Sequence, residues 1–428
     1  MNRIAQTPPM GWNSWDCYGT SVTEGEVIAN AEFMAGHLLS FGWDTIVVDI
    51  QWYEPTARAG GYNDAPPIEL DAWGRQMPAT NRFPSAANGA GFGPLATRVH
   101  DLGLRFGLNV MRGIPRLAVS QSLPIYGVAG VSTTDIADVS STCAWNPDNY
   151  GLNHAHPGAQ AYYDAQVAQF ANWGVDFIKA DDMLAPYYTV EIEAYARAIA
   201  RSGRDMVLSL SPGTELSLAH QPHLAAHSTL WRVSDDLWDR WTDVYDQFGR
   251  MARWSAYQQP DAWADADMLP LGRIGIRAER GADRLSLLTQ EEQRTLLTLW
   301  CIARSPLMFG GDLPSTPPGT LSLLTNPDVL AMHRASSGQR ELLREGDTIV
   351  WSARATDRAA DYVAVFNTLD AERSIRLPLS SLGMSTDATK GRDLWFGTDV
   401  TPDGAILPLS VPAHGVRLVR FDNARRDR

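Results

Sequence analysis

The sequence predicts an α/β protein, a (β/α)8 TIM barrel followed by a C-terminal antiparallel β-sandwich domain. Over the first three quarters of the 428 residues, short apolar runs alternate with segments that have the apolar spacing of amphipathic helices. Nearer the end, the runs become short, alternate apolar with polar residues, and are bounded by Asp, Gly and Pro. Repeated β-α units form parallel strands with right-handed crossovers, and eight of them suit a closed barrel.

The barrel strands are predicted at eight apolar runs, separated in most cases by helices. They are "PPMGWNSW", "DTIVVDIQW", "RFGLNVM", "DFIKADD", "DMVLSLS", "LWRVSDD", "DADMLPLG" and "PLMFGGDL". Helices are predicted at 24–40, 93–103, 159–174, 188–202, 239–257 and 291–305. A doubly wound open sheet is the alternative. It would need a glycine-rich phosphate turn after the first strand, and "GWNSWDCYG" is not one.

The domain boundary is predicted where alternating strands and helices give way to short strands bounded by Asp, Gly and Pro. The barrel is expected over 1–325, and a short helix at "PDVLAMHR" follows. The antiparallel domain is expected over 335–428, with strands at "DTIVWSAR", "DYVAVFNT", "RSIRLPL", "RDLWFG" and "AILPLSV...GVRLVRF".

Composition excludes several classes of function. The net charge of −13 makes nucleic acid an improbable partner, because binding to phosphates needs clustered Lys and Arg. No run of 18 apolar residues and no signal-peptide core occurs, which predicts no membrane span and a cytoplasmic protein. The three cysteines are scattered, so a disulfide framework is not expected. The 15 tryptophans slightly favour carbohydrate, since flat aromatic faces stack on sugar rings.

Acidic residues stand at the ends of several predicted strands. Asp49, the pair Asp181–Asp182 and the pair Asp235–Asp236 follow three of them, and Asp267 lies within a fourth. Catalytic groups of such barrels lie at the C-terminal strand ends, so these acids are expected to converge on one site. Lys179 and Arg232 lie among them.

The chemistry that these residues favour is glycoside hydrolysis. Paired carboxylates supply a nucleophile and a proton donor, and a retaining enzyme holds them about 5–5.5 Å apart. Lys179 would keep Asp181 ionised. His154 and His156 resemble a metal pair, but no third ligand stands at a suitable spacing, so no metal is predicted. The residues alone do not say which aspartate plays which role.

Eight sequence blocks resemble glycoside hydrolase family 27, the family of α-galactosidases and α-N-acetylgalactosaminidases. The blocks are "TPPMGWNSW", "RFPS", "LGLRFGL", "WGVDFIKADD", "WRVSDDLWDRW", "DADMLPLG", "SPLMFGGDL" and "VPAHGVRLVRF", in family order over nearly the whole chain. The resemblance implies a barrel with a C-terminal β domain, retention of configuration, and no metal or other cofactor.

The resemblance also assigns roles by position. The family's K-x-D strand end falls on Lys179 and Asp181, which implies that Asp181 is the nucleophile and Lys179 binds a sugar hydroxyl. The R-x-x-x-D motif falls on Arg232 and Asp236, which makes Asp236 the acid/base. Asp235 is the alternative, and only the spacing from Arg232 decides against it. The ring-stacking tryptophan falls on Trp15.

Three positions depart from the α-galactosidase pattern. Asp49-Ile50 replaces an Asp-Asp pair that binds the 4- and 6-hydroxyls of galactose, and "VVDIQWYEP" resembles the β-L-arabinopyranosidase branch. β-L-Arabinopyranose has the stereochemistry of α-D-galactose without C6, so an aliphatic residue suits it. Ser211 lies where a bulkier residue approaches the 2-hydroxyl, and a small residue there could admit a 2-acetamido group. Asn109 replaces a tyrosine.

The predicted function is a retaining exo-glycosidase that releases terminal β-L-arabinopyranosyl units, with secondary α-D-galactosidase activity. A glycoside or oligosaccharide is the expected partner, and the sequence leaves open whether the chain forms a homo-oligomer. One alternative is an α-galactosidase or α-N-acetylgalactosaminidase proper. The other is a non-catalytic carbohydrate-binding protein on the same fold. The complete set of Lys179, Asp181, Arg232 and Asp236 argues against the latter.

Overall fold

The computed structural model describes residues 4–382 and 390–422. Eight parallel strands form the sheet of the first domain, in the order β10-β9-β8-β7-β3-β2-β1-β13. They are β1 Met10–Asn13, β2 Thr45–Val48, β3 Arg105–Met111, β7 Phe177–Asp181, β8 Val207–Leu210, β9 Leu230–Arg232, β10 Trp263–Asp265 and β13 Leu307–Phe309. A parallel bridge between Leu269 and Phe309 joins the two ends of this sheet. The predicted barrel is therefore confirmed.

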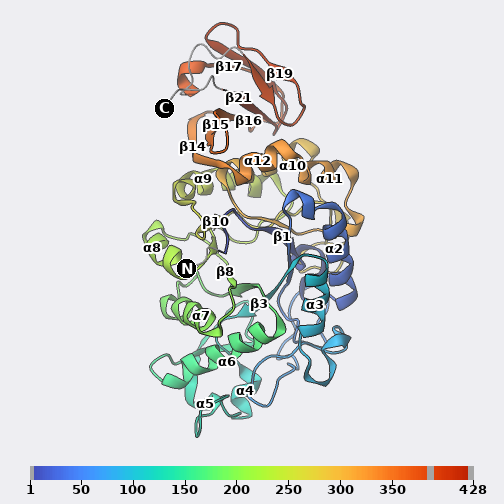
Figure 1. Ribbon diagram of the computed structural model, residues 1–428, viewed down its shortest axis with the longest axis vertical. Helices are drawn as coiled ribbons and strands as arrows, with labels where there is room; N and C mark the ends of the chain where they lie inside the picture. The colour runs from blue at the N-terminus through green and yellow to red at the C-terminus, as the bar shows by residue number, and fades with distance from the viewer. Residues whose placement is uncertain (1–3, 383–389, 423–428) are drawn as a thin grey trace.

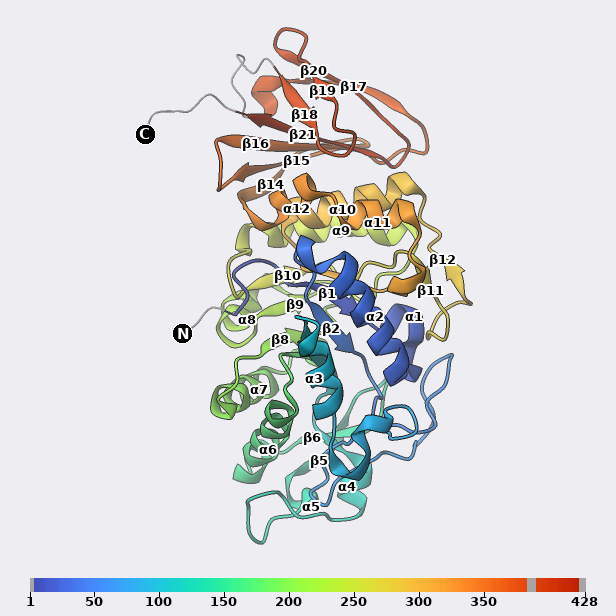
Figure 2. The same ribbon diagram turned by 45° about the vertical axis from the view of Figure 1, so that its right-hand side comes forward.

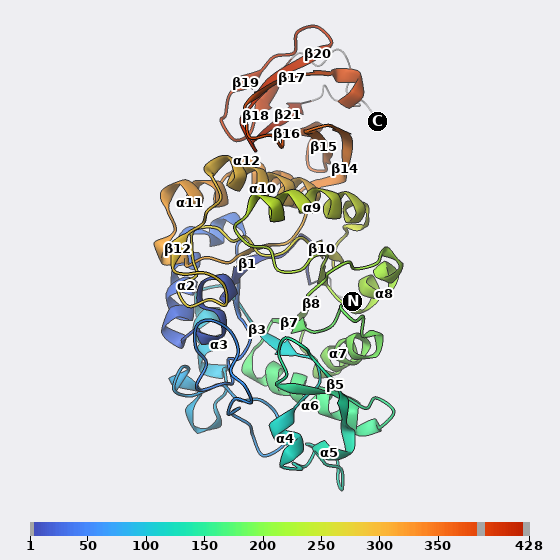
Figure 3. The same cartoon turned by 180° about the vertical axis from the view of Figure 1, so that it is seen from behind.

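Helices cover the outside of these strands, as Figure 3 shows. They are α1 Trp15–Tyr18, α2 Glu24–His37, α3 Gly93–Asp101, α6 Pro157–Trp173, α7 Thr189–Ser202, α8 Gln221–His227, α9 Trp241–Trp254 and α10 Gln290–Ala303. Start and stop signals in the sequence account for several ends. Thr23 and Glu26 form a capping box at the start of α2, and Gly174 ends α6 in the left-handed conformation.

Two excursions from the barrel were not predicted. The first follows β3 and contains β4 Ile114–Pro115, α4 Arg116–Ser120, α5 Thr133–Ile136, β5 Ala137–Thr142 and β6 Asn149–Leu152. It lies at the end of the molecule opposite the C-terminal domain (Figure 2). The second is the hairpin of β11 Arg273–Ile274 and β12 Arg284–Leu285. Both excursions contribute loops to the site described below.

The C-terminal domain is an antiparallel sandwich, as predicted. Its larger sheet has the order β14-β15-β16-β21-β18-β19 and its smaller sheet pairs β17 with β20. The strands are β14 Ser336–Glu345, β15 Thr348–Ala355, β16 Ala360–Asn367, β17 Arg373–Pro378, β18 Gly391–Asp393, β19 Asp399–Val400, β20 Ile406–Val411 and β21 Val416–Asp422. The parts of the expected domains at 1–3, 383–389 and 423–428 lie outside the described residues.

The sandwich packs on the helical face that α9, α10 and α12 (Pro327–Arg334) present (Figure 1). Helices α11 Pro318–Leu324 and α12 Pro327–Arg334 connect the two domains. Trp241 of α9 stacks on His414 with 4.0 Å between ring centroids, and Thr295 of α10 donates a hydrogen bond to the His414 carbonyl at 2.7 Å. These partly buried contacts hold the sandwich against the helices of the barrel.

Helices long and apolar enough to cross a membrane are not found in the described part of the chain. The thiols of Cys17, Cys143 and Cys301 are all buried and free.

Candidate active site

A cavity of about 240 Å³ lies at the C-terminal ends of the barrel strands. Parallel strands bring these ends to one mouth of a barrel, so loops far apart in sequence line one space. The lining residues are Trp15, Asp49, Ile50, Tyr62, Trp145, Lys179, Asp181, Pro212, Asp235, Asp236, Glu279 and Arg280. Carboxylates and aromatic rings therefore dominate its wall, the combination that a sugar-binding site needs.

Lys179 connects two of the carboxylates in this cavity. Its ammonium nitrogen Nζ lies 2.8 Å from Oδ2 of Asp49 and 3.8 Å from Oδ2 of Asp181. Burial disfavours the ammonium charge, but Asp181 and Asp49 outweigh that effect and raise the pKa of Lys179. Lys179 and Asp181 are two residues apart along β7, so both side chains point to the same face of the strand.

Asp49 is further held by the end of the first strand. The side-chain amide of Asn13 donates to Oδ2 of Asp49 at 2.7 Å, and the hydroxyl of Ser14 accepts from the Asp49 backbone N–H at 2.9 Å. These bonds leave the carboxylate in a defined orientation toward the cavity.

Two neutral donors and one cation surround the carboxylate of Asp181. The Ser211 hydroxyl donates to Oδ1, the Asn109 side-chain amide donates to Oδ2, and Lys179 lies on the same side as Oδ2. Burial raises the pKa of Asp181, while Lys179 and these donors oppose the rise. The carboxylate is thus oriented by one donor from β3, Asn109, and by one donor directly after β8, Ser211.

Arg232 holds a second pair of acids at the end of β9. Its Nη2 atom lies 3.1 Å from Oδ1 of Asp236, and its Nη1 atom lies 2.9 Å from Oδ1 of Asp267. Asp236 remains partly accessible, with 33% of its side chain exposed. Burial works against the Asp236 anion, but Arg232 and Lys179 outweigh it and lower the pKa of Asp236.

Asp267 differs from Asp236 because it is fully enclosed. Its carboxylate accepts a hydrogen bond from the backbone N–H of Leu237 at 2.6 Å. Burial raises its pKa to about 7, with Arg232 opposing the shift and Asp236 adding to it. The sequence prediction that Asp267 lies within a strand was wrong. β10 ends at Asp265, and Asp267 follows it outside any strand, with φ of 88°.

Ile50 forms an apolar part of the cavity wall directly beside Asp49. Its side chain is 2% exposed and packs in a cluster that includes Trp15, Val47 and Met111. The next residue, Gln51, turns away from the cavity, and its amide donates to Asp148 at 2.8 Å. Ile50, and not Gln51, therefore faces the cavity, and the wall has no polar side-chain group at this position.

The structure distributes the other residues singled out in the sequence as follows. Trp15, Asp49, Ile50, Lys179, Asp181 and Asp236 line the cavity, whereas Ser211 and Arg232 lie buried behind it and contact the two candidate catalytic acids. Asp182 pairs with Arg112 at 2.8 Å. His154 and His156 separate: His154 lies 3.0 Å from Glu191, and His156 caps α6.

Comparison with known proteins decides the family. Residues 148–335 match the alpha galactosidase A family model, and residues 345–421 match the alpha galactosidase C-terminal beta sandwich domain. A solved family 27 β-L-arabinopyranosidase from Geobacillus stearothermophilus, in complex with arabinose, is 48% identical with a TM-score of 0.96, covering 99% of this chain and 100% of that one. The chain belongs to glycoside hydrolase family 27.

Other relatives of this family 27 glycosidase carry different activities in their names. A Bacillus halodurans protein provisionally assigned as an α-N-acetylgalactosaminidase is 42% identical with a TM-score of 0.88, covering 98% of both chains. An α-galactosidase from Cyamopsis tetragonoloba is 27% identical over 427 residues, covering 97% of this chain and 86% of its own length.

Besides Pro212, four aromatic or charged residues that line the cavity of this family 27 site were missed from the sequence. Tyr62 stacks near Trp15 with centroids 6.1 Å apart, and Trp145 lies 5.9 Å from Tyr62. Glu279 and Arg280 come from the loop between β11 and β12. All four stand in long loops without periodicity, where only their aromatic or charged nature could have given a signal.

Proposed function

We propose that the protein is a retaining exo-glycosidase that releases terminal β-L-arabinopyranosyl units and has secondary α-D-galactosidase activity. The observation that carries this proposal is the position of Ile50, which lines the cavity beside Asp49. An aliphatic side chain cannot hydrogen-bond a hydroxymethyl group, and its bulk occupies the space that C6 of galactose would need. Arabinopyranose lacks C6, and a β-L-arabinopyranosidase is 48% identical to this chain.

The proposed nucleophile is Asp181. Its carboxylate attacks the anomeric carbon and forms a covalent glycosyl-enzyme while the bond to the leaving oxygen breaks. Asn109 and Ser211 fix the direction of attack by holding one oxygen each. Lys179 contributes a positive charge beside the attacking group and shares it with Asp49, which is placed to bind a sugar hydroxyl.

The proposed acid/base is Asp236. It delivers its proton to the leaving oxygen, then takes a proton from the water that hydrolyses the glycosyl-enzyme. Its partial exposure allows the leaving group and then water to reach it, whereas Asp267 on the same arginine is 1% exposed and cannot serve. Asp235, which also lines the cavity, has no hydrogen bond to Arg232 among the described residues.

A binding face for the sugar ring is provided by aromatic residues. Trp15 is 5% exposed and is fixed by its backbone hydrogen bond to Asn13 at 2.8 Å and by packing against Ile50. Tyr62 and Trp145 extend the aromatic wall outward, where Trp145 is 41% exposed. We assign Trp15 to the terminal sugar and the outer rings to the group that leaves.

Two substrates test the proposal directly. We expect kcat/KM for p-nitrophenyl β-L-arabinopyranoside to exceed that for the α-D-galactopyranoside by about ten- to a hundredfold. A hydroxyl group that is buried without a hydrogen-bond partner lowers kcat/KM by about this factor. A larger kcat/KM for the galactoside would refute the assignment of Ile50 and favour an α-galactosidase. Turnover of neither substrate, with sugar binding retained, would favour a carbohydrate-binding protein.

A covalent trap tests the roles of the acids. A 2-deoxy-2-fluoro-β-L-arabinopyranosyl fluoride should label one carboxylate, because the fluorine at C2 slows both steps, whereas the good fluoride leaving group keeps the first step fast enough for the glycosyl-enzyme to accumulate. Peptide mass spectrometry should place the label on Asp181, and the first product should keep the anomeric configuration of the substrate. A label on Asp236 would reverse the two roles.

A further inference from the structure

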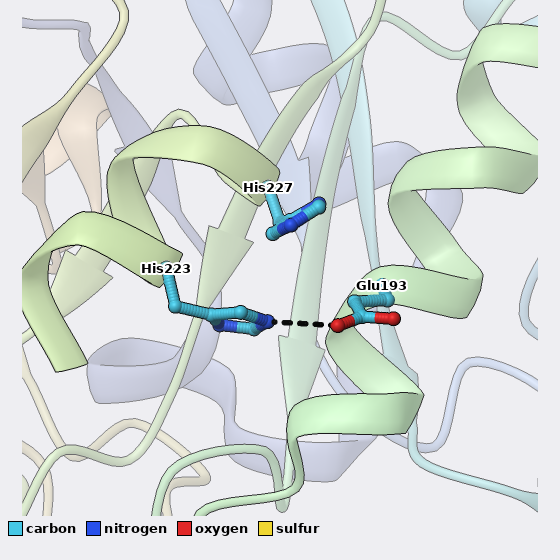
Figure 4. Close-up of side chains that lie close together, drawn as sticks. All are labelled: Glu193, His223 and His227. Atoms are coloured by element: carbon cyan, nitrogen blue, oxygen red, sulfur yellow. Dashed lines mark ion pairs between the residues drawn. The ribbon is translucent and has the colours of Figure 1, made fainter.

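Three side chains suited to metal binding gather on the outer surface of the barrel, between α7 and α8. Glu193 of α7 and His223 and His227 of α8 each place a ligand atom within 4.8 Å of the others. Figure 4 shows the three side chains pointing into the space between the two helices. Within the described ranges, no other group of three or more His, Cys, Asp or Glu residues meets this spacing.

The two histidines occupy one face of their helix. His223 and His227 are four residues apart, so they lie one turn apart on α8, and their ring centroids are 4.6 Å from each other. Helical zinc motifs use the same four-residue spacing. His220, one turn earlier, is occupied differently, because its ring stacks on Tyr187 at 3.7 Å.

The contact between the helices has the length expected of two metal ligands. Nε2 of His223 lies 3.4 Å from Oε1 of Glu193, the pair that Figure 4 joins by a dashed line. A charge-assisted hydrogen bond is typically about 2.7–2.9 Å long. With metal–ligand bonds of about 2.0–2.1 Å, two ligand atoms of a tetrahedral zinc lie about 3.3 Å apart. The buried Nε2 atom makes no hydrogen bond in the described structure.

The atoms of these ligands that face away from the site are already engaged. Nδ1 of His223 lies 2.6 Å from the hydroxyl of Tyr187, and Oε2 of Glu193 accepts a hydrogen bond from Arg197 at 3.2 Å. Such outer partners fix the tautomer and the orientation of metal ligands.

We propose that Glu193, His223 and His227 form a Zn²⁺ site with a fourth position open to water. Two imidazoles and one carboxylate are a donor set that zinc accepts. The ion would join α7, which follows the strand of Asp181, to α8, which precedes the strand of Arg232. Its role would be to stabilise this pair of helices, and the proposal does not depend on the substrate of the barrel.

Calorimetric titration of the full-length, tag-free protein with zinc sulfate tests the site. We expect one zinc per chain and a melting temperature that rises with zinc concentration. His227→Asn should lower the zinc affinity by at least about tenfold and leave glycoside hydrolysis unchanged. Glu193→Gln, on the other helix, should weaken binding as well.

His220→Asn is the matched control, because His220 precedes the same helix but contributes no ligand atom to the cluster. It should keep the zinc affinity of the wild type. Tyr187→Phe should weaken binding by about tenfold, since it removes the partner of Nδ1. Absence of zinc binding to the wild type, or equal affinities of the His227→Asn and His220→Asn variants, would overturn the proposal.

Discussion

The ammonium nitrogen of Lys179 lies 2.8 Å from the carboxylate of Asp49, and both groups are largely enclosed. A second carboxylate, that of Asp181, lies 3.8 Å from the same nitrogen. One cation therefore compensates two buried acids at the centre of the site. Removing one member of such a group leaves an uncompensated charge, which costs more than the intact pair contributes.

Lys179→Met should consequently destabilise the protein by about 3–5 kcal/mol at neutral pH and abolish measurable hydrolysis. The loss in unfolding free energy should shrink at acidic pH, because burial raises the pKa of Asp181 and a proton can then neutralise that carboxylate. Urea denaturation at two pH values measures both effects.

Arg201→Met is a suitable control for this prediction. Arg201 forms a short ion pair with Asp164 at 2.6 Å, but its own side chain is 58% exposed. Exposed pairs contribute less than about 1 kcal/mol, so stability and activity should stay close to the wild type. Similar losses in the two variants would contradict the assigned role of Lys179.

The preference for arabinopyranose should depend on Ile50. We expect Ile50→Asp to raise the ratio of galactoside to arabinoside kcat/KM by about ten- to a hundredfold, because it supplies an acceptor for the 6-hydroxyl. Ile50→Asn offers a similar acceptor without adding a charge beside Asp49, and should shift the ratio in the same direction.

Ile50→Ala separates space from hydrogen bonding. It opens the wall without supplying a partner, so it should shift the ratio less than either polar variant. An unchanged ratio in all three variants would show that Ile50 does not face the C6 position.

The apolar pattern of the sequence was sufficient to predict β7, which carries Asp181, and its neighbour β3. The run "RFGLNVM" coincides with β3, and "DFIKADD" contains β7, because buried parallel strands are continuous apolar runs. Short irregular segments escaped this reasoning. Trp15 was predicted to end a strand, but β1 ends at Asn13 and Trp15 begins a helical turn.

The hydrogen bonds behind the cavity could not be predicted, because they join residues far apart in the sequence and no local pattern encodes their distances. Ser211 was expected near the sugar 2-hydroxyl, yet its hydroxyl binds the carboxylate of Asp181. Gly213 shows how closely the chain passes the end of β9: a Cβ atom would lie 1.9 Å from the carbonyl oxygen of Arg232. Such close approaches between successive strands position Pro212 in the wall and appear only in three dimensions.

The pH dependence of hydrolysis should reveal how Arg232 controls Asp236. Only the form with an ionised nucleophile and a protonated acid reacts, and Arg232 lowers the pKa of that acid. Arg232→Gln should therefore raise the pKa of Asp236 and move the basic limb of the kcat/KM profile to higher pH. Profiles on an aryl glycoside with a poor leaving group, which requires the acid, measure the shift.

Arg98→Gln serves as the control, because the pair of Arg98 in α3 with Glu32 in α2 is exposed and neither residue lines the cavity. Its pH profile should superimpose on that of the wild type. A basic limb that stays in place in the Arg232 variant, while total activity falls, would assign Arg232 to substrate binding alone.

Asp267 should make the stability of the protein depend on pH. Its pKa is about 7 in the folded chain, against about 3.9 for an unperturbed aspartate, so the folded state binds its proton more tightly than the unfolded state. Stability from this group is present at acidic pH and is lost as pH rises from about 4 to about 7. The loss that we expect is about 2–4 kcal/mol.

Asp267→Asn removes this titration while keeping an oxygen that can accept from the Leu237 N–H. Between pH 4.5 and 8, its unfolding free energy should therefore fall by about 2–4 kcal/mol less than that of the wild type. Asp246→Asn, whose side chain is 61% exposed, should reproduce the wild-type slope. The same slope in the Asp267 variant as in the wild type would mean that Arg232 keeps Asp267 ionised throughout.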